Sequence, residues 1–336
     1  MIDSSRSVIG SITVPSCQAA ASVDRLARMT GGVAVVGSIS ADLTVFADPL
    51  PRPGETVIAE AFSMVLGGKG ANQALAAVRA GARTFMVGAV GDDLFRGLTL
   101  DTLTSEGIDT SAVQVVDGNT GIAHIRVDTS TGQNDIAIVP NANHRLTPDA
   151  VERSLQALAG EVSVVLIQLE VPLPVVIRVA ETCRALDLQL IVDPAPAQPL
   201  PDEVWRGVSI VVPNETEAEV LTGIRTGDRE SAERAGRWFL DRGVQTAMIT
   251  LAERGLLVID GEPVTEQPAF SVEAVDTTAA GDAFAGMLGA SLAWGLPLPA
   301  AVRRGLAAGA LAVTVRGASP SLPTARAVDH FLAGSP

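Results

Sequence analysis

Continuous apolar runs alternate with helical segments along most of the chain. Residues 33–37, 85–91 and 162–169 contain few polar side chains, which is typical of strands buried on both faces of a parallel sheet. From residue 147 onward, strands and helices alternate regularly with short connections. The pattern predicts a doubly wound α/β fold, with a mostly parallel sheet flanked by helices and antiparallel edge strands at 255–260 and 270–275.

Two other segments, residues 42–65 and 120–140, carry alternating apolar and polar positions. Such alternation is typical of half-exposed strands. Because a strand–helix unit separates the two segments, they predict one small sheet that stands off the main domain. We therefore expect a single domain over residues 31–336 with a small β-sheet lid. Residues 1–30 are weakly patterned and are expected to form a poorly ordered tail.

Composition restricts the partners of the protein. The 336 residues carry a formal net charge of −14, which repels nucleic acid and anionic membranes, and only 3% of them are aromatic, which leaves few surfaces for base stacking. Cys17 and Cys183 lie far apart without metal-ligand spacing, and no apolar run is long enough to span a membrane. These features predict a cytoplasmic protein that binds small molecules, not nucleic acid or membrane.

The chain Asp-Thr-Thr-Ala-Ala-Gly-Asp at residues 276–282 leads directly into an apolar helix. Backbone N–H groups at a helix N-terminus bind anions when no bulky side chain blocks them. Asp282 would repel a phosphate bound there, unless its carboxylate takes a proton from the group that attacks the phosphate. The simpler interpretation is that Asp282 only caps the helix.

Polar residues also follow several of the predicted strands. The carboxyl ends of parallel strands meet at one edge of a sheet, so these residues are expected near one ligand, although each is also explained as a cap or a loop residue. They are Asp42, Gln168, Glu170, Asp193, Asn214, Glu217 and Thr250.

A second glycine-rich turn, Gly-Gly-Lys-Gly at residues 67–70, opens another helix. Gly70 stands where a P-loop has Ser or Thr, and no Gly-x-Gly-x-x-Gly follows the first strand, so the P-loop and the dinucleotide-binding motif are both excluded. The turn instead offers Lys69 and Asn72 to the hydroxyl groups of a polyol. The alternative is an ordinary helix start with a surface lysine.

Six motifs together resemble those of the ribokinase-type carbohydrate kinases of the pfkB family. In chain order they are GSISAD at 37–42, PGET at 53–56, GGKGANQA at 67–74, GDD at 91–93, PNETEAE at 213–219 and DTTAAGD at 276–282. The combination is more specific than any one motif, and the similarity extends from about residue 31 to the C-terminus. It implies ATP-dependent transfer of the γ-phosphoryl group to the 5-hydroxyl of a pentose, in the first place D-ribose.

The resemblance also implies roles for individual residues in catalysis and sugar binding. Asp282 would be the general base, and the N–H groups of Ala279, Ala280, Gly281 and Asp282 would form an anion hole for the transferred group. The sugar hydroxyls would be held by Asp282 and by Ser40, Asp42, Gly68, Lys69, Asn72 and Glu170.

ATP, Mg²⁺ and K⁺ are implied in the same way. Nucleotide contacts would come from Asn214, Thr250, Ala252, Glu253, Arg254, Gly255, Gly281 and Leu306. Glu217 would organise Mg²⁺ through water, together with Asn214. K⁺ would bind beside the anion hole, mostly through backbone carbonyls, at Asp276, Thr278, Ala312, Val315, Gly317 and Ser321. An exposed small sheet with apolar residues on both faces further predicts a homodimer through the lid.

Three residues depart from the family pattern. Ser40 replaces an asparagine that contacts the sugar, and its shorter hydroxyl leaves 2-deoxyribose or another pentose as alternative substrates. Ala252 replaces a glycine, which requires a negative φ at that position. Leu306 replaces a polar residue near the adenine. A nucleoside kinase and a non-catalytic sugar or nucleotide sensor are further alternatives, and the polar lid and the presence of both Gly281 and Asp282 argue against them.

Overall fold

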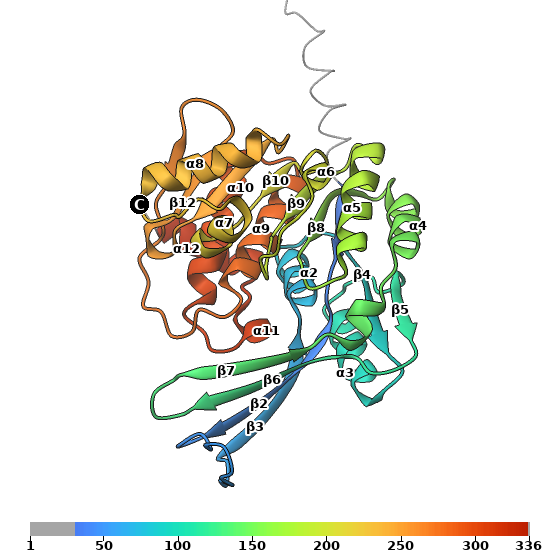
Figure 1. Ribbon diagram of the computed structural model, residues 1–336, viewed down its shortest axis with the longest axis vertical. Helices are drawn as coiled ribbons and strands as arrows, with labels where there is room; N and C mark the ends of the chain where they lie inside the picture. The colour runs from blue at the N-terminus through green and yellow to red at the C-terminus, as the bar shows by residue number, and fades with distance from the viewer. Residues whose placement is uncertain (1–30, 335–336) are drawn as a thin grey trace, which may run out of the picture.

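The computed structural model describes residues 31–334, so the expectation for residues 1–30 lies outside the described part of the chain. A nine-stranded sheet forms the centre of the molecule, with the strand order β13-β12-β11-β10-β9-β8-β1-β4-β5 (Figure 1). The strands from β11 to β5 in this order run parallel, and β12 and β13 are antiparallel additions at one edge. Their bounds are β1 Gly32–Val36, β4 Thr84–Gly91, β5 Val113–Val116, β8 Val162–Ile167, β9 Gln189–Val192, β10 Ile210–Val211, β11 Thr246–Thr250, β12 Leu256–Ile259 and β13 Thr265–Gln267.

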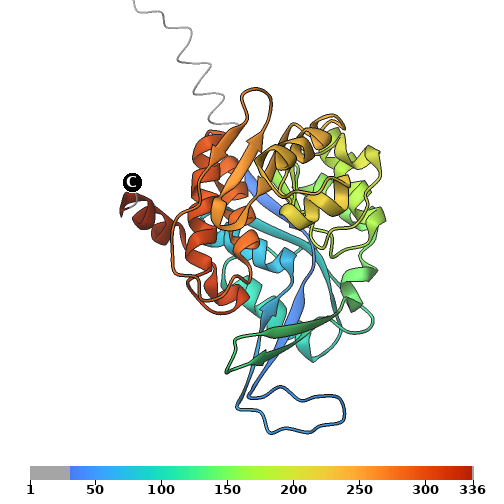
Figure 2. The same ribbon diagram turned by 60° about the vertical axis from the view of Figure 1, so that its left-hand side comes forward.

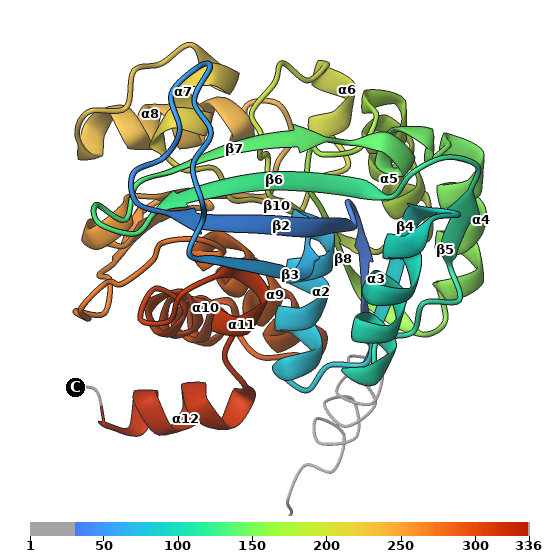
Figure 3. The same ribbon diagram turned by 90° about the horizontal axis from the view of Figure 1, so that it is seen from below.

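Helices cover both faces of this sheet (Figure 3). On one face the buried core joins the sheet to α4 Pro148–Leu158, α5 Leu173–Leu186, α6 Asp202–Trp205, α7 Glu215–Thr222 and α8 Arg229–Leu240. On the other face it joins the sheet to α2 Lys69–Arg79, α3 Leu94–Ser105, α9 Ala280–Ala293, α10 Leu298–Ala312 and α12 Ala325–Gly334. The predicted doubly wound α/β fold is thereby confirmed.

A separate four-stranded sheet projects from the main domain (Figures 1 and 2). It has the order β3-β2-β6-β7 and consists of β2 Ser40–Ala47, β3 Ala61–Gly67, β6 Gly121–Asp128 and β7 Asn134–Val139. β2 leaves the domain shortly after β1, and β3 returns directly into α2. The small sheet is therefore connected at its base to the strand ends where ligands of such folds bind.

One predicted edge strand is wrong. Residues 270–275 form no strand, and the antiparallel edge is completed by Thr265–Gln267, which pairs with β12. Pro268 lacks an N–H group for further pairing, and Phe270 packs edge-to-face against Phe331 of α12, with ring centroids 5.1 Å apart. The first apolar residue of this segment therefore packs on a helix, and the segment forms no strand.

Within the described residues 31–334, the remaining elements are short: the 3₁₀ turns η1 Asn141–Arg145 and η2 Ala252–Arg254, and the helix α11 Ala318–Ser321. Within residues 31–334, no helix is both long and apolar enough to cross a membrane.

Candidate active site

Asp282 lies in the first turn of α9 and is almost completely buried, at 4% exposure. The helix begins at Ala280 and its N-cap is Ala279, so the interpretation of Asp282 as an N-cap is wrong. Its two carboxylate oxygens instead accept hydrogen bonds from neighbouring residues of α2. Asn72 Nδ2 donates to Oδ2 at 3.2 Å, and Gln73 Nε2 donates to Oδ1 at 3.0 Å.

Close packing of α2 on α9 makes these bonds possible. Gly286 lies one turn beyond Asp282 on α9, and a Cβ atom built on it would be 2.4 Å from the Cβ of Ala76 and 2.7 Å from the carbonyl oxygen of Gln73. Only glycine fits at this contact. The two helices therefore bring the amides of Asn72 and Gln73 within reach of Asp282.

Ala279 has a left-handed backbone, with φ 61°. Non-glycine residues adopt this conformation rarely, and when they do it is often at functional sites. A Cβ atom on the exposed Gly281 would meet nothing within 4 Å. The turn thus leaves open space beside the first N–H groups of α9. These N–H groups have no hydrogen-bond acceptor within the helix and are available to a ligand.

Ser40 and Asp42 lie buried on β2, at the base of the small sheet. Ser40 Oγ donates a hydrogen bond to Asp42 Oδ1 at 2.9 Å. Burial raises the pKa of Asp42 to about 6, against the bond from Ser40, and the charges of Glu170 and Asp282 act in the same direction as burial. Asp42 therefore belongs electrostatically to the same site as Asp282.

Lys69 and Glu170 also lie in this site. The backbone N–H of Lys69 donates to Glu170 Oε2 at 3.1 Å, and Ser38 Oγ donates to the same oxygen. The Lys69 ammonium is 3.9 Å from Asp193 Oδ2. Burial alone would lower the pKa of Lys69, but the surrounding carboxylates of Asp282, Asp193 and Glu170 raise it overall.

Gly68 is the N-cap of α2 and has φ 90°. A Cβ atom there would be 2.9 Å from the carbonyl oxygen of Ser38. A Cβ atom on the neighbouring Gly67 would be 2.0 Å from the Asp42 carboxylate, so neither position has room for a side chain. The glycine-rich turn therefore lets α2 begin directly against the residues that follow β1.

On the other side of Asp282, Asn214 and Glu217 form a reciprocal capping box at the start of α7. Glu217 N donates to Asn214 Oδ1 and Asn214 N donates to Glu217 Oε2, both at 2.8 Å. Burial raises the pKa of Glu217, and the charge of Asp282 adds to this effect. Asn214 and Glu217 therefore cap α7, and only Oε2 of Glu217 takes part in the capping hydrogen bonds. Oε1 of Glu217 makes no bond in the capping box.

The turn at residues 252–255 follows β11 and is exposed except for Gly255. The backbone N–H of Thr250 donates to the carbonyl of Pro213 at 3.0 Å, and Arg254 forms an ion pair with Glu215 at 2.5 Å, so the turn lies beside α7. Ala252 has φ 51°. The expectation of a negative φ at Ala252 is therefore wrong, because the tertiary contacts of the turn hold the alanine in the left-handed region.

The residues predicted to bind K⁺ come from two neighbouring segments. The Asp276 carboxylate accepts hydrogen bonds from the backbone and hydroxyl of Thr278 and, at 2.8 Å, from the backbone N–H of Gly317. These bonds outweigh partial burial and lower the pKa of Asp276. Ala312 ends α10, Val315 and Gly317 follow it, and Ser321 ends α11. Leu306 is half-buried on α10 against the core.

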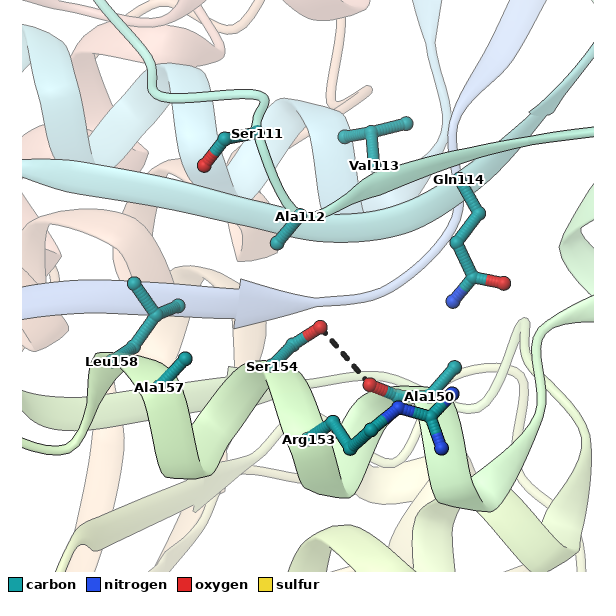
Figure 4. A pocket seen from close by; sticks show the side chains of 9 residues that line it. All are labelled: Ser111, Ala112, Val113, Gln114, Ala150, Arg153, Ser154, Ala157 and Leu158. Carbon is teal, nitrogen blue, oxygen red and sulfur yellow. Dashed lines mark hydrogen bonds between the residues drawn. The ribbon is translucent and has the colours of Figure 1, made fainter.

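A groove lies elsewhere, between α4 and the first residues of β5 (Figure 4). Arg153 is the only charged residue among the nine side chains that line it, and none of the nine is a predicted site residue. The groove therefore contributes nothing to the site around Asp282.

Gln73 and Ser38 belong to this site although the sequence pattern assigns no role to either of them. Gln73 has the closer relation to Asp282. It is completely buried and contacts both Asp193 and Asp282. Only its position inside the motif at 67–74 could have indicated a role, because a single glutamine in a helix belongs to no motif that marks a functional site. Gln168, recognised only as a strand-end residue, donates to Gln73 Oε1.

Comparison with known proteins agrees with this architecture. The pattern of the pfkB family carbohydrate kinases matches residues 31–325. A ribokinase of Haemophilus influenzae is 38% identical over 299 residues, which cover 89% of this chain and 97% of the relative. A deoxyribokinase of Salmonella typhi is 34% identical over 302 residues, covering 89% of this chain and 98% of the relative.

Solved structures give the same result. The structure of Arabidopsis thaliana ribokinase complexed with ribose and ATP is 31% identical, with a TM-score of 0.83 over 91% of this chain and all of that one. A ribokinase of Thermotoga maritima is 34% identical, with a TM-score of 0.83 over 90% of this chain. The predicted resemblance is confirmed: the chain belongs to the pfkB family of carbohydrate kinases.

Proposed function

We propose that this protein transfers the γ-phosphoryl group of ATP to the terminal hydroxyl of a pentose, converting D-ribose to D-ribose 5-phosphate. The observation that carries this proposal is the buried carboxylate of Asp282 at the start of α9, which accepts hydrogen bonds from Asn72 and Gln73 of α2. Asp42, Lys69 and Glu217 lie within electrostatic reach of it. The ribokinase relatives and the Arabidopsis complex with ribose and ATP support it.

The sugar would bind between the base of the small sheet and the start of α2. Asp42, Lys69 and Glu170 offer charged partners for its hydroxyls, and Ser40 and Gly68 line the same region. Asn72 Oδ1 is buried without a hydrogen-bond partner among the described residues. A buried acceptor without a partner is costly, so a sugar hydroxyl that donates to Asn72 would satisfy it.

Phosphoryl transfer needs a base for the attacking hydroxyl and donors for the charge on the transferred group. Asp282 would accept the proton from the terminal hydroxyl. The N–H groups of residues 279–282 would bind the oxygens of the transferred phosphoryl group, because Gly281 leaves the space beside them open.

ATP would lie along the strand ends with its base near Leu306 of α10. Thr250 and residues 252–255 would contact the nucleotide, and Asn214 its phosphates. Within residues 31–334 no three His, Cys, Asp or Glu side chains are grouped closely enough to hold a metal directly, so Mg²⁺ would be held through water and by the phosphates. Glu217 keeps one carboxylate oxygen outside its capping box for such a water, and Asp193, Glu217 and Asp282 lie within electrostatic reach of each other with Lys69 as the cation among them. Mg²⁺ would offset this excess negative charge and that of the phosphates.

The loops around Asp276 fit a monovalent cation. Thr278, Val315 and the other residues predicted there would offer mainly carbonyl oxygens, and Asp276 already connects both segments through Gly317. K⁺ in this place would act on the backbone of the anion hole without touching the sugar.

The small sheet would serve as a lid and as the contact surface of a homodimer. Its two edge strands expose large apolar side chains, including Phe62 at 63% on β3 and Ile138 at 58% on β7. Exposed edge strands with apolar side chains favour pairing with a second copy. The enzyme would act in the cytoplasm, because its two cysteines are far apart in the sequence and do not suggest the disulfides of secreted proteins. Cys183 is a free, buried cysteine.

A second candidate substrate is 2-deoxyribose. The Ser40 hydroxyl already donates to Asp42, so it has less capacity left for a sugar hydroxyl than a longer amide side chain would have. The similarity to a deoxyribokinase supports this alternative.

The test is sugar-dependent release of ADP from ATP, measured with ribose, 2-deoxyribose, other pentoses, hexoses and nucleosides. We expect the highest kcat/KM with a pentose, and loss of most turnover in Asp282→Asn with the fold retained. Near-normal kcat in Asp282→Asn would refute the base assignment. Binding of sugar and ATP without any turnover would instead indicate a sensor.

A further inference from the structure

Gln73 lies at the centre of the site but is not among the residues that would hold the sugar. It belongs to the second turn of α2, directly after Asn72, and its side chain is 0% exposed. A fully buried amide between two helices needs hydrogen-bond partners. Its partners identify what it does.

The Gln73 amide joins two carboxylates. Nε2 donates to Asp193 Oδ2 at 2.8 Å and to Asp282 Oδ1 at 3.0 Å. Both of its N–H bonds are thereby used, one for each carboxylate. On the other end of the amide, Gln168 Nε2 donates to Gln73 Oε1.

This network fixes the orientation of the amide. A carboxylate only accepts hydrogen bonds, so the Gln73 nitrogen has to face Asp282 and the Gln73 oxygen has to face the Gln168 donor. The reversed amide would place its single oxygen against both carboxylate oxygens and its NH2 group against the NH2 group of Gln168. Gln73 therefore has one favourable orientation.

The two amides of α2 hold Asp282 from both sides. Asn72 binds Oδ2 and Gln73 binds Oδ1, so the plane of the carboxylate is set by one helix turn. Asn72 would also contact the sugar, whereas Gln73 is completely buried. Gln73 can thus orient the carboxylate independently of whether a sugar is bound.

Charge around the carboxylate explains why an amide is needed. Asp282 interacts electrostatically with Asp42 from β2, Asp193 after β9 and Glu217 from α7, and with Lys69 from α2 as the cation. Burial raises the pKa of Asp193 to about 7. An amide between Asp193 and Asp282 supplies a donor to each and so weakens the effect of their repulsion.

We propose that Gln73 is a positioning residue for phosphoryl transfer: its amide holds Oδ1 of Asp282 and leaves the carboxylate aimed at the attacking sugar hydroxyl. This inference rests on the proposed role of Asp282 as the base. Gln73 itself touches neither the sugar nor ATP, so it acts on the rate of transfer and not on binding of the ground state.

The test is Gln73→Met, which keeps the volume of the side chain and removes both donors. We expect kcat to fall about 10- to 100-fold, because hydrogen bonds to a charged group are lost, while KM for sugar and ATP stays within about threefold. Gln73→Asn, with an amide one methylene shorter, should show the same pattern if Gln73→Met does not fold.

The matched control is Ala76→Gly, which removes a methyl group from the same α2–α9 contact without forcing the helices apart and without touching Asp282. We expect a lower thermal midpoint with kcat close to wild type. Wild-type kcat in Gln73→Met, or an equal loss of kcat in Ala76→Gly, would overturn the inference. An inactive wild-type protein would contradict the proposed function itself, which is a separate outcome.

Discussion

The contact between α2 and α9 at Gly286 permits a direct test of how the site is held together. In Gly286→Ala the added methyl carbon would lie 2.4 Å from the Cβ of Ala76 and 2.7 Å from the carbonyl oxygen of Gln73. Carbon atoms in contact prefer separations of about 3.5–4.0 Å, so the helices have to separate by about 1 Å. Gly286→Ala should therefore disturb both packing and catalysis.

The magnitudes follow from these distances. Overpacking of this kind costs about 1–3 kcal/mol, and the better helix propensity of alanine offsets up to about 1 kcal/mol of that. The hydrogen bonds from Asn72 and Gln73 to Asp282, at 3.2 and 3.0 Å, would lengthen to about 4 Å and break. A displacement of about 1 Å in a reacting group can lower kcat about 100-fold.

The assay combines steady-state kinetics of ADP release with thermal unfolding. The matched control is Gly289→Ala on the same helix, where the three atoms nearest to the new methyl all belong to the Leu166 side chain and lie at 3.1–3.4 Å, not under 3 Å as at Gly286. We expect Gly289→Ala to keep kcat within about threefold of wild type. The reasoning would be refuted if Gly286→Ala retained wild-type kcat, or if both variants lost activity equally.

Three further predictions concern single residues. Ala252→Gly should raise the thermal midpoint by about 1–2 °C, because relief of the left-handed alanine outweighs the added flexibility of the unfolded chain; calorimetry measures this, and a fall in the midpoint would contradict it. The pKa of Asp42 is raised to about 6 and that of Asp193 to about 7 by burial, so the folded state binds more protons than the unfolded state between about pH 4 and 7. Stability of the ligand-free protein should therefore fall as pH rises through this range, and Asp42→Asn should reduce the fall; equal slopes in both proteins would be the contrary result. Ser40→Asn should raise the ratio of kcat/KM for ribose over 2-deoxyribose about tenfold if the amide gains a hydrogen bond to ribose; an unchanged ratio would exclude Ser40 as a determinant of specificity.

The apolar pattern was sufficient to predict the fold because a strand buried on both faces has to be continuously apolar. The runs that became β1, β4 and β8 show this directly. Residues 270–275 show the limit of the same rule. Phe270 packs on Phe331 of α12 and Val275 is 53% exposed, so the segment forms no edge strand, and a short apolar segment has the same pattern in either case.

The candidate site was predictable only where chemistry has a local signature. Glycine-rich turns, and polar residues directly after apolar strands, mark Lys69, Asp282 and Glu217. The negative φ expected at Ala252 was wrong because the φ of one residue depends on contacts with distant segments. Here the turn that contains Ala252 is tied to α7 by the ion pair between Arg254 and Glu215.

The sequence by itself determined the α/β class, the pfkB family resemblance and the chemical types present at the strand ends. Only the tertiary structure decided how Asp282 is held. Gln73 and Asp282 are 209 positions apart in the chain, and no local pattern relates them. Their contact depends on how closely two helices approach at Gly286, and that distance is set by packing across the whole layer of helices.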